Sequence, residues 1–554
     1  MAEQDLRHSS VNSKSSVGRA AAAMSVATLM SRVLGLVREQ VFAYFFGAGH
    51  ATDAFQIAFR IPNLLRDLFA EGAMSASLVP TFTRVRAEEG DRRAWRVAGL
   101  VFRVLFVFVS FLAVVGVIFA PQLVEIYASA YHLVEGKFEL TVTMTRLLFP
   151  FFPLVALAAA FMGILNACGK FFLPAFASAL FNAASIVVGV ALTLLLPQWG
   201  VEPIVGMAIG VLAGGAVQAF CQLPTLYRVG YRWPGFVAGK DPLWHRDPAL
   251  RKVLVMMLPG TLGLAATQVN VLVNSILATS QGAGAVSWLN YAFRLMQFPI
   301  GVFGVSLASA TLPQVSRMWV AKDVAGTAQV IQTSLRQVFA VNLPASAGLA
   351  FLGVPIIQML FQHGRFDASD TQATAWALAM YAVGLTAYSG VKVLVPVCYA
   401  LGKVRIAVIS SVFSVLFTLL CNWLLIGPMG FAGLALGTSC AAVLNFVFLL
   451  FAVRLALAAQ GQSFDWGPIF KPFVVYLGVA LGMGAGGGGS HHLWDQFLGS
   501  PEGAMGRIFK VLVLVGEGGL FVIGAAYLLR LQDLLDAFDI FTKKVKNKLS
   551  RKSN

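Results

Sequence analysis

Four arginines lie inside long apolar segments of the chain: Arg32, Arg38, Arg66 and Arg294. A guanidinium group stays charged at physiological pH, and its planar fork can make two hydrogen bonds to an anion such as a diphosphate. Charges at membrane depth are costly, and they usually face an internal cavity and serve function. The four arginines therefore predict a site for an anionic head group. The alternative interpretation is a set of ion pairs that lock the fold together.

Three of these arginines belong to one stretch, residues 31–81, which is typical of two apolar helices joined by a glycine-rich turn. The stretch carries eight charges, the other five being Glu39, Asp53, Arg60, Asp67 and Glu71. In its second helix, acidic and basic residues recur at helical spacing and share one stripe. A ladder of salt bridges within that helix is the simplest interpretation. We expect Glu39, Arg60, Asp67 and Glu71, together with Lys392, to form a charge network around the arginine site.

Composition places these charges in a membrane protein. The chain has 554 residues, of which 58% are hydrophobic and 12% charged, and its mean hydropathy is +0.76. A soluble domain has about 25% charged residues. About fourteen segments are long and apolar enough to span a bilayer as helices. They lie near residues 20–46, 51–82, 97–120, 140–168, 171–197, 203–227, 253–280, 284–315, 335–361, 371–401, 404–427, 430–453, 472–490 and 508–529.

The distribution of basic residues predicts the orientation. The net charge of +16 could suggest a nucleic-acid partner, but most Lys and Arg residues fall in alternate connections between the apolar segments. The opposite connections hold only Lys137, Arg365 and Arg507. This asymmetry follows the positive-inside rule. We therefore expect no nucleic-acid partner, and we expect both termini in the cytoplasm.

The second half of the chain repeats motifs of the first. Gly47-Ala48-Gly49 recurs as Gly282-Ala283-Gly284, and Ala58-Phe59-Arg60 recurs as Ala292-Phe293-Arg294. Several such matches at near-constant separation predict two six-helix lobes, related by a pseudo-two-fold axis along the membrane normal. The predicted parts are an N-terminal tail (1–19), a first lobe (20–228), a cytoplasmic linker (229–252), a second lobe (253–456), two last helices (470–530) and a basic amphipathic tail (531–554). That tail predicts contact with anionic membrane lipids.

Signatures of catalysis are missing from the sequence. It has no GxxxxGK[ST] phosphate-binding loop, no HExxH and no GxSxG, so neither ATP hydrolysis nor a common hydrolase chemistry is indicated. The five cysteines and seven histidines show no metal-binding spacing. We expect a protein that binds and moves a substrate, with no covalent chemistry, no metal and no cofactor.

Residues 31–82, with the motifs Val286–Pro299, Phe361–Phe366 and Val391–Pro396, resemble the MurJ (MviN) family of lipid II flippases, within the multidrug/oligosaccharidyl-lipid/polysaccharide exporter superfamily. The resemblance covers essentially the whole chain. It implies fourteen helices around a central cationic cavity, with the last two forming a groove for the undecaprenyl tail. The family's cavity arginines match Arg32, Arg38, Arg66 and Arg294, and its cavity aspartate matches Asp53.

The function implied by the resemblance is alternating-access transport of lipid II, the undecaprenyl-diphosphate-linked peptidoglycan precursor, from the inner to the outer leaflet of the bacterial cytoplasmic membrane. Membrane potential or an ion gradient is the expected drive, and the expected state is a monomer. Two alternatives stay open. One is an exporter of another polyprenyl-diphosphate glycan or of drugs, and the other is a non-transporting membrane scaffold for cell-wall enzymes.

Overall fold

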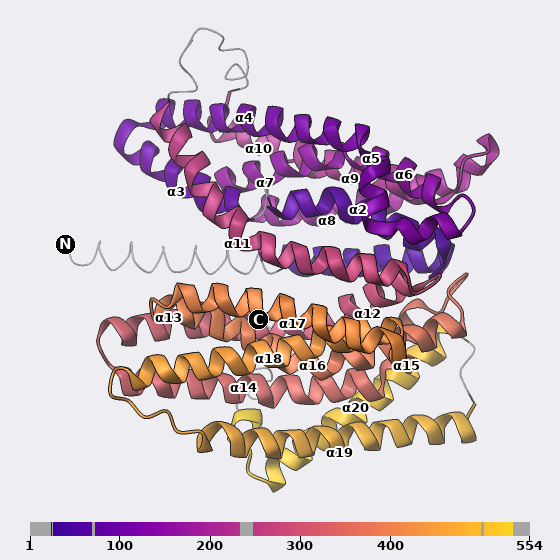
Figure 1. The fold of residues 1–554 in the computed structure, drawn as a ribbon, viewed down its shortest axis with the longest axis vertical. Coiled ribbons are helices and arrows are strands. Elements are labelled where there is room, and N and C mark those ends of the chain that lie inside the picture. Colours follow the sequence, from indigo (N-terminus) through magenta and orange to yellow (C-terminus); the bar gives the residue numbers. More distant parts are fainter. Residues whose placement is uncertain (1–23, 25, 69–71, 233–246, 500–502, 536–554) are drawn as a thin grey trace, which may run out of the picture. The chain divides into compact units, whose positions relative to one another are not determined.

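The computed structural model describes residues 24, 26–68, 72–232, 247–499 and 503–535 (Figure 1). Within these residues the chain is helical, and no strand occurs. The predicted all-helical membrane fold is therefore confirmed. The predicted N-terminal tail, most of the predicted linker and residues 536–554 of the predicted amphipathic tail lie outside the described residues.

The chain forms two compact units, Met1–Ala283 and Gly284–Asn554. Unit 1 begins with a first helix, described from residue 26 to residue 46. It continues with α2 (His50–Arg66), α3 (Gly72–Glu89), α4 (Asp91–Ile118), α5 (Ala120–Ala128), η2 (Ser129–Leu133), α6 (Lys137–Leu148), α7 (Phe151–Ala167), α8 (Phe172–Leu195), η3 (Leu196–Trp199), α9 (Ile204–Phe220), α10 (Leu223–Arg228) and α11 (Pro248–Thr279). The helices of unit 1 pack chiefly as the pairs α8–α9, α3–α11 and α2–α6.

Unit 2 contains α12 (Ala285–Pro299), η6 (Ile300–Gly304), α13 (Val305–Val320), α14 (Val324–Phe351), α15 (Gly353–Phe361), α16 (Ala368–Ala400), α17 (Val404–Met429), α18 (Phe431–Ala458), α19 (Gly467–Phe497) and α20 (Ala504–Leu528). Helix α18 packs against α16 and α17, and α14 packs against α16 and α19. The element η6 is a π-helix, so α12, η6 and α13 form one irregular span.

Ten helical segments in the described part of the chain are long and apolar enough to cross a membrane, or eleven if the bent pair α14–α15 counts as one. In their described residues, all of the predicted segments contain helix, including the first helix, α2–α3 and α11. The full count of fourteen spans stays a prediction. The bend of 72° between α14 and α15 divides a segment that the sequence predicts as one span.

The boundary between the two units differs from the predicted boundary between the lobes. The motif repeat assigns α11 to the second lobe, which is predicted to begin at residue 253. In the structure, α11 packs against α3, α4 and α5 and belongs to unit 1. The predicted lobes are defined by similar sequence motifs, whereas the compact units are defined by contacts between helices. The two boundaries therefore need not coincide. The six-helix lobes and their pseudo-two-fold axis stay a prediction.

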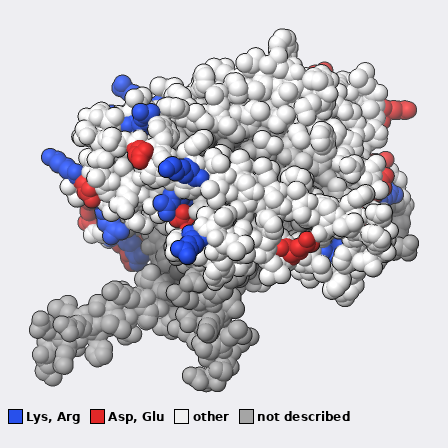
Figure 2. Space-filling model, turned by 90° about the horizontal axis from the view of Figure 1, so that it is seen from below, with Lys and Arg blue, Asp and Glu red and all other residues white. Residues whose placement is uncertain are grey.

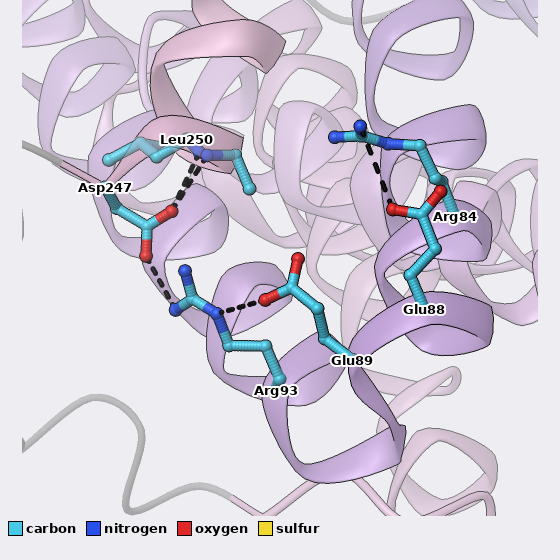
Figure 3. A network of polar contacts seen from close by, with 7 residues as sticks. Arg84, Glu88, Glu89, Arg93, Asp247 and Leu250 are labelled. Carbon is cyan, nitrogen blue, oxygen red and sulfur yellow. Dashed lines mark hydrogen bonds and ion pairs between the residues drawn. The ribbon is translucent and has the colours of Figure 1, made fainter.

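The start of α11 is held by a polar network (Figure 3). Asp247 caps the helix by accepting hydrogen bonds from the backbone N–H groups of Ala249 and Leu250. Its carboxylate also accepts a 2.7 Å hydrogen bond from Arg93, which bonds Glu89 at the end of α3 as well. Burial opposes ionisation of Asp247, but the hydrogen bonds from Arg93 and from the helix N-terminus hold its pKa below the ordinary value. The network therefore ties α11 to the turn between α3 and α4.

The surfaces of both units are strongly apolar. Large exposed side chains in unit 1 include Phe111, Val187 and Leu194, and those in unit 2 include Trp423, Leu455 and Leu520. Figure 2 shows one face, on which charged side chains gather toward the two ends and leave a broad uncharged area between them. Such a surface suits the hydrocarbon core of a bilayer, where charge is costly.

Candidate functional site

The first helix carries two of the predicted site arginines in different environments. Arg32 is exposed. Arg38 is buried; its guanidinium lies 3.1 Å from the carboxylate of Glu39 and 5.5 Å from the ring centre of Phe181 on α8. Glu39 is therefore paired with Arg38, and its place in a charge network around a substrate site stays a prediction. Phe181 was not predicted, because an aromatic residue in an apolar helix gives no signal of a cation partner.

Arg60 on α2 and Asp67, directly after that helix, contact side chains of α11. Arg60 donates a 2.8 Å hydrogen bond to the hydroxyl of Ser275, and Gln268 donates a 3.3 Å bond to Asp67. The partners on both helices are seven residues apart, so the contacts form two rungs between antiparallel helices. The simple interpretation of a salt-bridge ladder within α2 misses these neutral partners from α11.

Arg66 lies at the end of α2 and is half-buried. It makes two hydrogen bonds to the carboxylate of the adjacent Asp67, of 3.1 and 2.7 Å. Asp67 therefore bridges Arg66 and Gln268, and it fixes the guanidinium against α11. Glu71, which was predicted to extend the same network, lies outside the described residues.

Asp53 lies in the first turn of α2 and is completely buried. Its carboxylate accepts a 3.2 Å hydrogen bond from Lys137, the first residue of α6, which is also buried. The sequence places Lys137 in a connection between spans and gives no sign of this contact, because the two residues are 84 positions apart. The structure thus assigns Asp53 a buried countercharge.

Arg294 is half-buried on α12, the tenth residue of that helix and about 14 Å from its start along the axis. Pro299 and the π-turn η6 follow it. Proline removes a backbone donor and crowds the preceding turn, which favours such a local widening. Lys392 lies on α16 of the same unit and is exposed.

The predicted residues divide between the two units. Arg294 and Lys392 belong to unit 2, and the other described members belong to unit 1: Arg32, Arg38, Glu39, Asp53, Arg60, Arg66 and Asp67. Within unit 1 the structure brings together Arg38 with Glu39 and Arg66 with Asp67. The side chains of unit 1 thus provide a set of held guanidinium groups, an arrangement that suits recognition of a phosphate or diphosphate.

Another ion pair joins the last two helices. Lys510 on α20 is buried and lies 2.5 Å from Asp495 on α19. The apolar segment predicted from the sequence ends at residue 490, before Asp495. Helix α19 instead continues to Phe497, so the carboxylate lies within reach of the lysine.

Among the described residues, no group of three or more His, Cys, Asp or Glu could hold a metal ion.

Comparison with known proteins places this arrangement in a family. The chain is 37% identical over 464 residues to the lipid II flippase MurJ of Burkholderia cenocepacia, covering 84% of this chain and 88% of that protein. It is 33% identical to the probable lipid II flippase MurJ of Vibrio cholerae, over 78% of this chain and 82% of the relative. The family model for lipid II flippase MurJ matches residues 42–494. The chain belongs to the MurJ family. MurJ proteins are transporters, so the expectation of a transport protein agrees with the family.

Solved structures show the same fold. A lipid II flippase MurJ in an inward closed conformation superposes with a TM-score of 0.74 at 24% identity, covering 92% of this chain and 99% of that chain. An inward-facing multidrug resistance MATE transporter of the MOP superfamily superposes with a TM-score of 0.66 at 16% identity, covering 80% and 99%. The fold is therefore shared by MurJ and MATE transporters, and the chain is a multi-pass membrane protein.

Proposed function

We propose that this chain moves lipid II from the inner to the outer leaflet of the bacterial cytoplasmic membrane and thereby supplies peptidoglycan synthesis. The observation that carries the proposal is the identity to MurJ flippases, 37% over 84% of the chain in the case of the Burkholderia cenocepacia protein. The chemistry of the candidate site supports it. Lipid II presents a diphosphate between its sugar and its polyprenyl tail, and guanidinium groups bind such an anion in a bidentate manner.

In this proposal, Arg32, Arg38, Arg66 and Arg294 bind the diphosphate during transport, and Lys392 adds positive charge. The acidic neighbours Glu39 and Asp67 orient two of the guanidinium groups, Arg38 and Arg66, at distances of 3.1 and 2.7 Å. An arginine already held by a carboxylate loses less conformational entropy when the substrate binds. Release of the head group then requires only exchange between carboxylate and phosphate partners.

The transport cycle we propose is alternating access without covalent chemistry. The sequence has no nucleotide-binding loop, so the membrane potential or an ion gradient drives the cycle. Moving a charge through 100 mV supplies about 2.3 kcal/mol. The last two helices, α19 and α20, hold the undecaprenyl tail, and the basic amphipathic tail predicted at residues 531–554 contacts anionic lipids. The protein acts as a monomer with both termini in the cytoplasm.

A reconstituted assay tests the proposal. Vesicles that contain the purified chain and fluorescent lipid II should move the lipid between leaflets, and an Arg294→Ala variant should lose that activity. An Arg365→Ala variant is the matched control, because Arg365 is an exposed loop residue of the same unit. Transport of a different polyprenyl-diphosphate glycan in place of lipid II would favour the related exporter. Transport of neither, with the chain folded, would favour the scaffold.

A further inference from the structure

The start of α2 carries a buried ion pair that the sequence does not reveal. Asp53 and Lys137 have side-chain exposures of 0% and 4%, and their charged atoms are 3.2 Å apart. At this burial neither charge is solvated by bulk water. An isolated buried charge is strongly unfavourable, and the ion pair compensates part of this cost for both residues.

The position of Lys137 is informative. It is the first residue of α6, where the helix dipole presents its positive end and disfavours a cation. The opposite holds for Asp53, because the first turn of α2 favours a carboxylate. Lys137 therefore gains nothing from its own helix, and its burial is explained by contacts with the residues around it.

Those contacts come from one further element. The ammonium group of Lys137 lies 4.0 Å from the ring centre of Tyr131 in η2. Tyr131 is itself buried, so the aromatic face and the Asp53 carboxylate surround the ammonium. A cation over an aromatic face is stabilised most when it is desolvated, as here. The pair thus connects three elements, α2, η2 and α6, at one point.

The connection has a consequence for α2. This helix carries Arg60 and Arg66, seven and thirteen residues after Asp53. Each residue turns a helix by about 100°, so a shift or rotation at its first turn is transmitted to side chains further along. Fixing Asp53 to α6 therefore fixes the direction in which both arginines point.

We propose that Lys137 is a positioning residue for transport. It neutralises Asp53 and holds the start of α2, so the requirement at both positions is for matched charge. Asp53 then serves as an anchor of α2 and does not contact the substrate. This inference rests on the proposed function for its transport readout, whereas its stability readout is independent of the substrate.

The experiment compares Asp53→Asn, Lys137→Met and the double variant in the full-length chain. Thermal unfolding in detergent is measured together with lipid II transport per folded molecule in vesicles. Breaking a buried pair by changing one partner leaves the other charge uncompensated, whereas replacing both partners is often neutral. Each single variant should lower the unfolding midpoint and reduce transport per folded molecule by about 10-fold or more. The double variant should recover to within about 3-fold of the wild type.

Matched controls are Glu139→Gln and Lys170→Met, which neutralise exposed residues of the same unit and should behave as wild type. A double variant as impaired as Asp53→Asn, or one that does not fold, would overturn the proposal. So would single variants with a normal transport rate per folded molecule, because the pair would then serve stability alone. A wild-type chain that does not move lipid II overturns the proposed function, while the recovery of the unfolding midpoint still tests the ion pair.

Discussion

At the scale of residues, an arginine at membrane depth needs partners that compensate its charge, and such a charge usually serves function. Arg38 and Arg66 are held by acidic neighbours in sequence, and Arg60 is held by a hydroxyl of α11. These contacts offset the cost of holding charge within the apolar region. A guanidinium presents its N–H donors in a planar fork, so a phosphate can replace a carboxylate partner with similar hydrogen-bond geometry.

Arg294 provides the first test at this scale. Changing it to lysine keeps the charge but removes the planar fork, so Arg294→Lys should reduce lipid II transport less than Arg294→Ala does. Loss of two charge-assisted hydrogen bonds corresponds to about 3 kcal/mol, or on the order of 100-fold in transport efficiency for the alanine variant. The rate of leaflet exchange in vesicles measures both. If both variants moved lipid II at the wild-type rate, Arg294 would not be part of the substrate site.

Residue types and spacing were enough to select the arginines, because a charge in an apolar segment is conspicuous in any sequence. They were not enough to assign partners. Lys137 looks like an ordinary loop residue, and its carboxylate partner is 84 positions away. Ser275 and Gln268 are neutral and give no charge signal. The roles of Arg32, Arg38, Arg66, Arg294 and Asp53 in substrate binding stay predictions. The place of Lys392 in the charge network stays a prediction as well.

At the scale of elements, the irregular span formed by α12, η6 and α13 positions Arg294. A π-turn contains one residue more than the regular helix would need. Deleting Ile300 should therefore restore a continuous α-helix and remove the local widening that follows Arg294. We expect this deletion to abolish transport while the chain still folds. Size-exclusion chromatography and vesicle transport measure the two outcomes, and undiminished transport would show that the π-turn does not position Arg294.

The start of α11 gives a second prediction at this scale. An Asp247→Asn variant keeps a capping oxygen but loses the charge that Arg93 contacts, which should destabilise the fold by about 1–2 kcal/mol. Thermal unfolding in detergent should show a midpoint lower by a few degrees. Glu88→Ala is the control, because Glu88 forms a partly exposed pair with Arg84 at 3.9 Å, and such pairs contribute little. An unchanged midpoint for Asp247→Asn would contradict the role of this cap.

The difference in stability between the wild type and Asp247→Asn should depend on pH, because the pKa of Asp247 is lowered in the folded state. Because the folded pKa lies below the ordinary value of 3.8, the contribution of the carboxylate is complete above that value and is lost as the pH falls through the folded pKa. The free energy of unfolding of the wild type should therefore exceed that of Asp247→Asn by a constant amount from neutral pH down to about pH 4. Below that pH the difference in unfolding free energy should shrink. A difference that changes between pH 6 and pH 8 would assign the effect to another group.

Hydropathy predicted the long helices well, because a span requires many consecutive apolar residues. It could not predict where a span breaks. The bend between α14 and α15 and the π-turn η6 depend on packing and on a few backbone hydrogen bonds. Short elements such as α5 and η2 are too brief to leave a periodic signal.

At the scale of the whole molecule, charge asymmetry predicts the orientation of the chain. In a background whose five natural cysteines are changed to serine, we expect Glu135→Cys to react with a membrane-impermeant maleimide in spheroplasts. Arg92→Cys should react only after permeabilisation, since it lies in a basic connection on the predicted cytoplasmic side. Both positions are exposed. The reverse pattern of labelling would invert the proposed topology.

The organisation into lobes shows what a sequence repeat can and cannot predict. The repeat locates corresponding helices in the two halves. The packing of α11 with α3, α4 and α5 depends on side chains that the repeat does not compare, and it places this helix in unit 1. Side chains on α11 also hold Arg60 and Asp67. Helix α11 therefore contributes directly to the environment of the site charges in unit 1.

The most direct test of the account is depletion of this chain in its own host, with the leaflet distribution of lipid-linked precursors as the readout. Lipid II should accumulate on the inner leaflet. The wild-type chain should relieve the accumulation, and Arg32→Ala and Arg294→Ala should not. Normal export of lipid II after depletion, with accumulation of another polyprenyl glycan or of none, would contradict it.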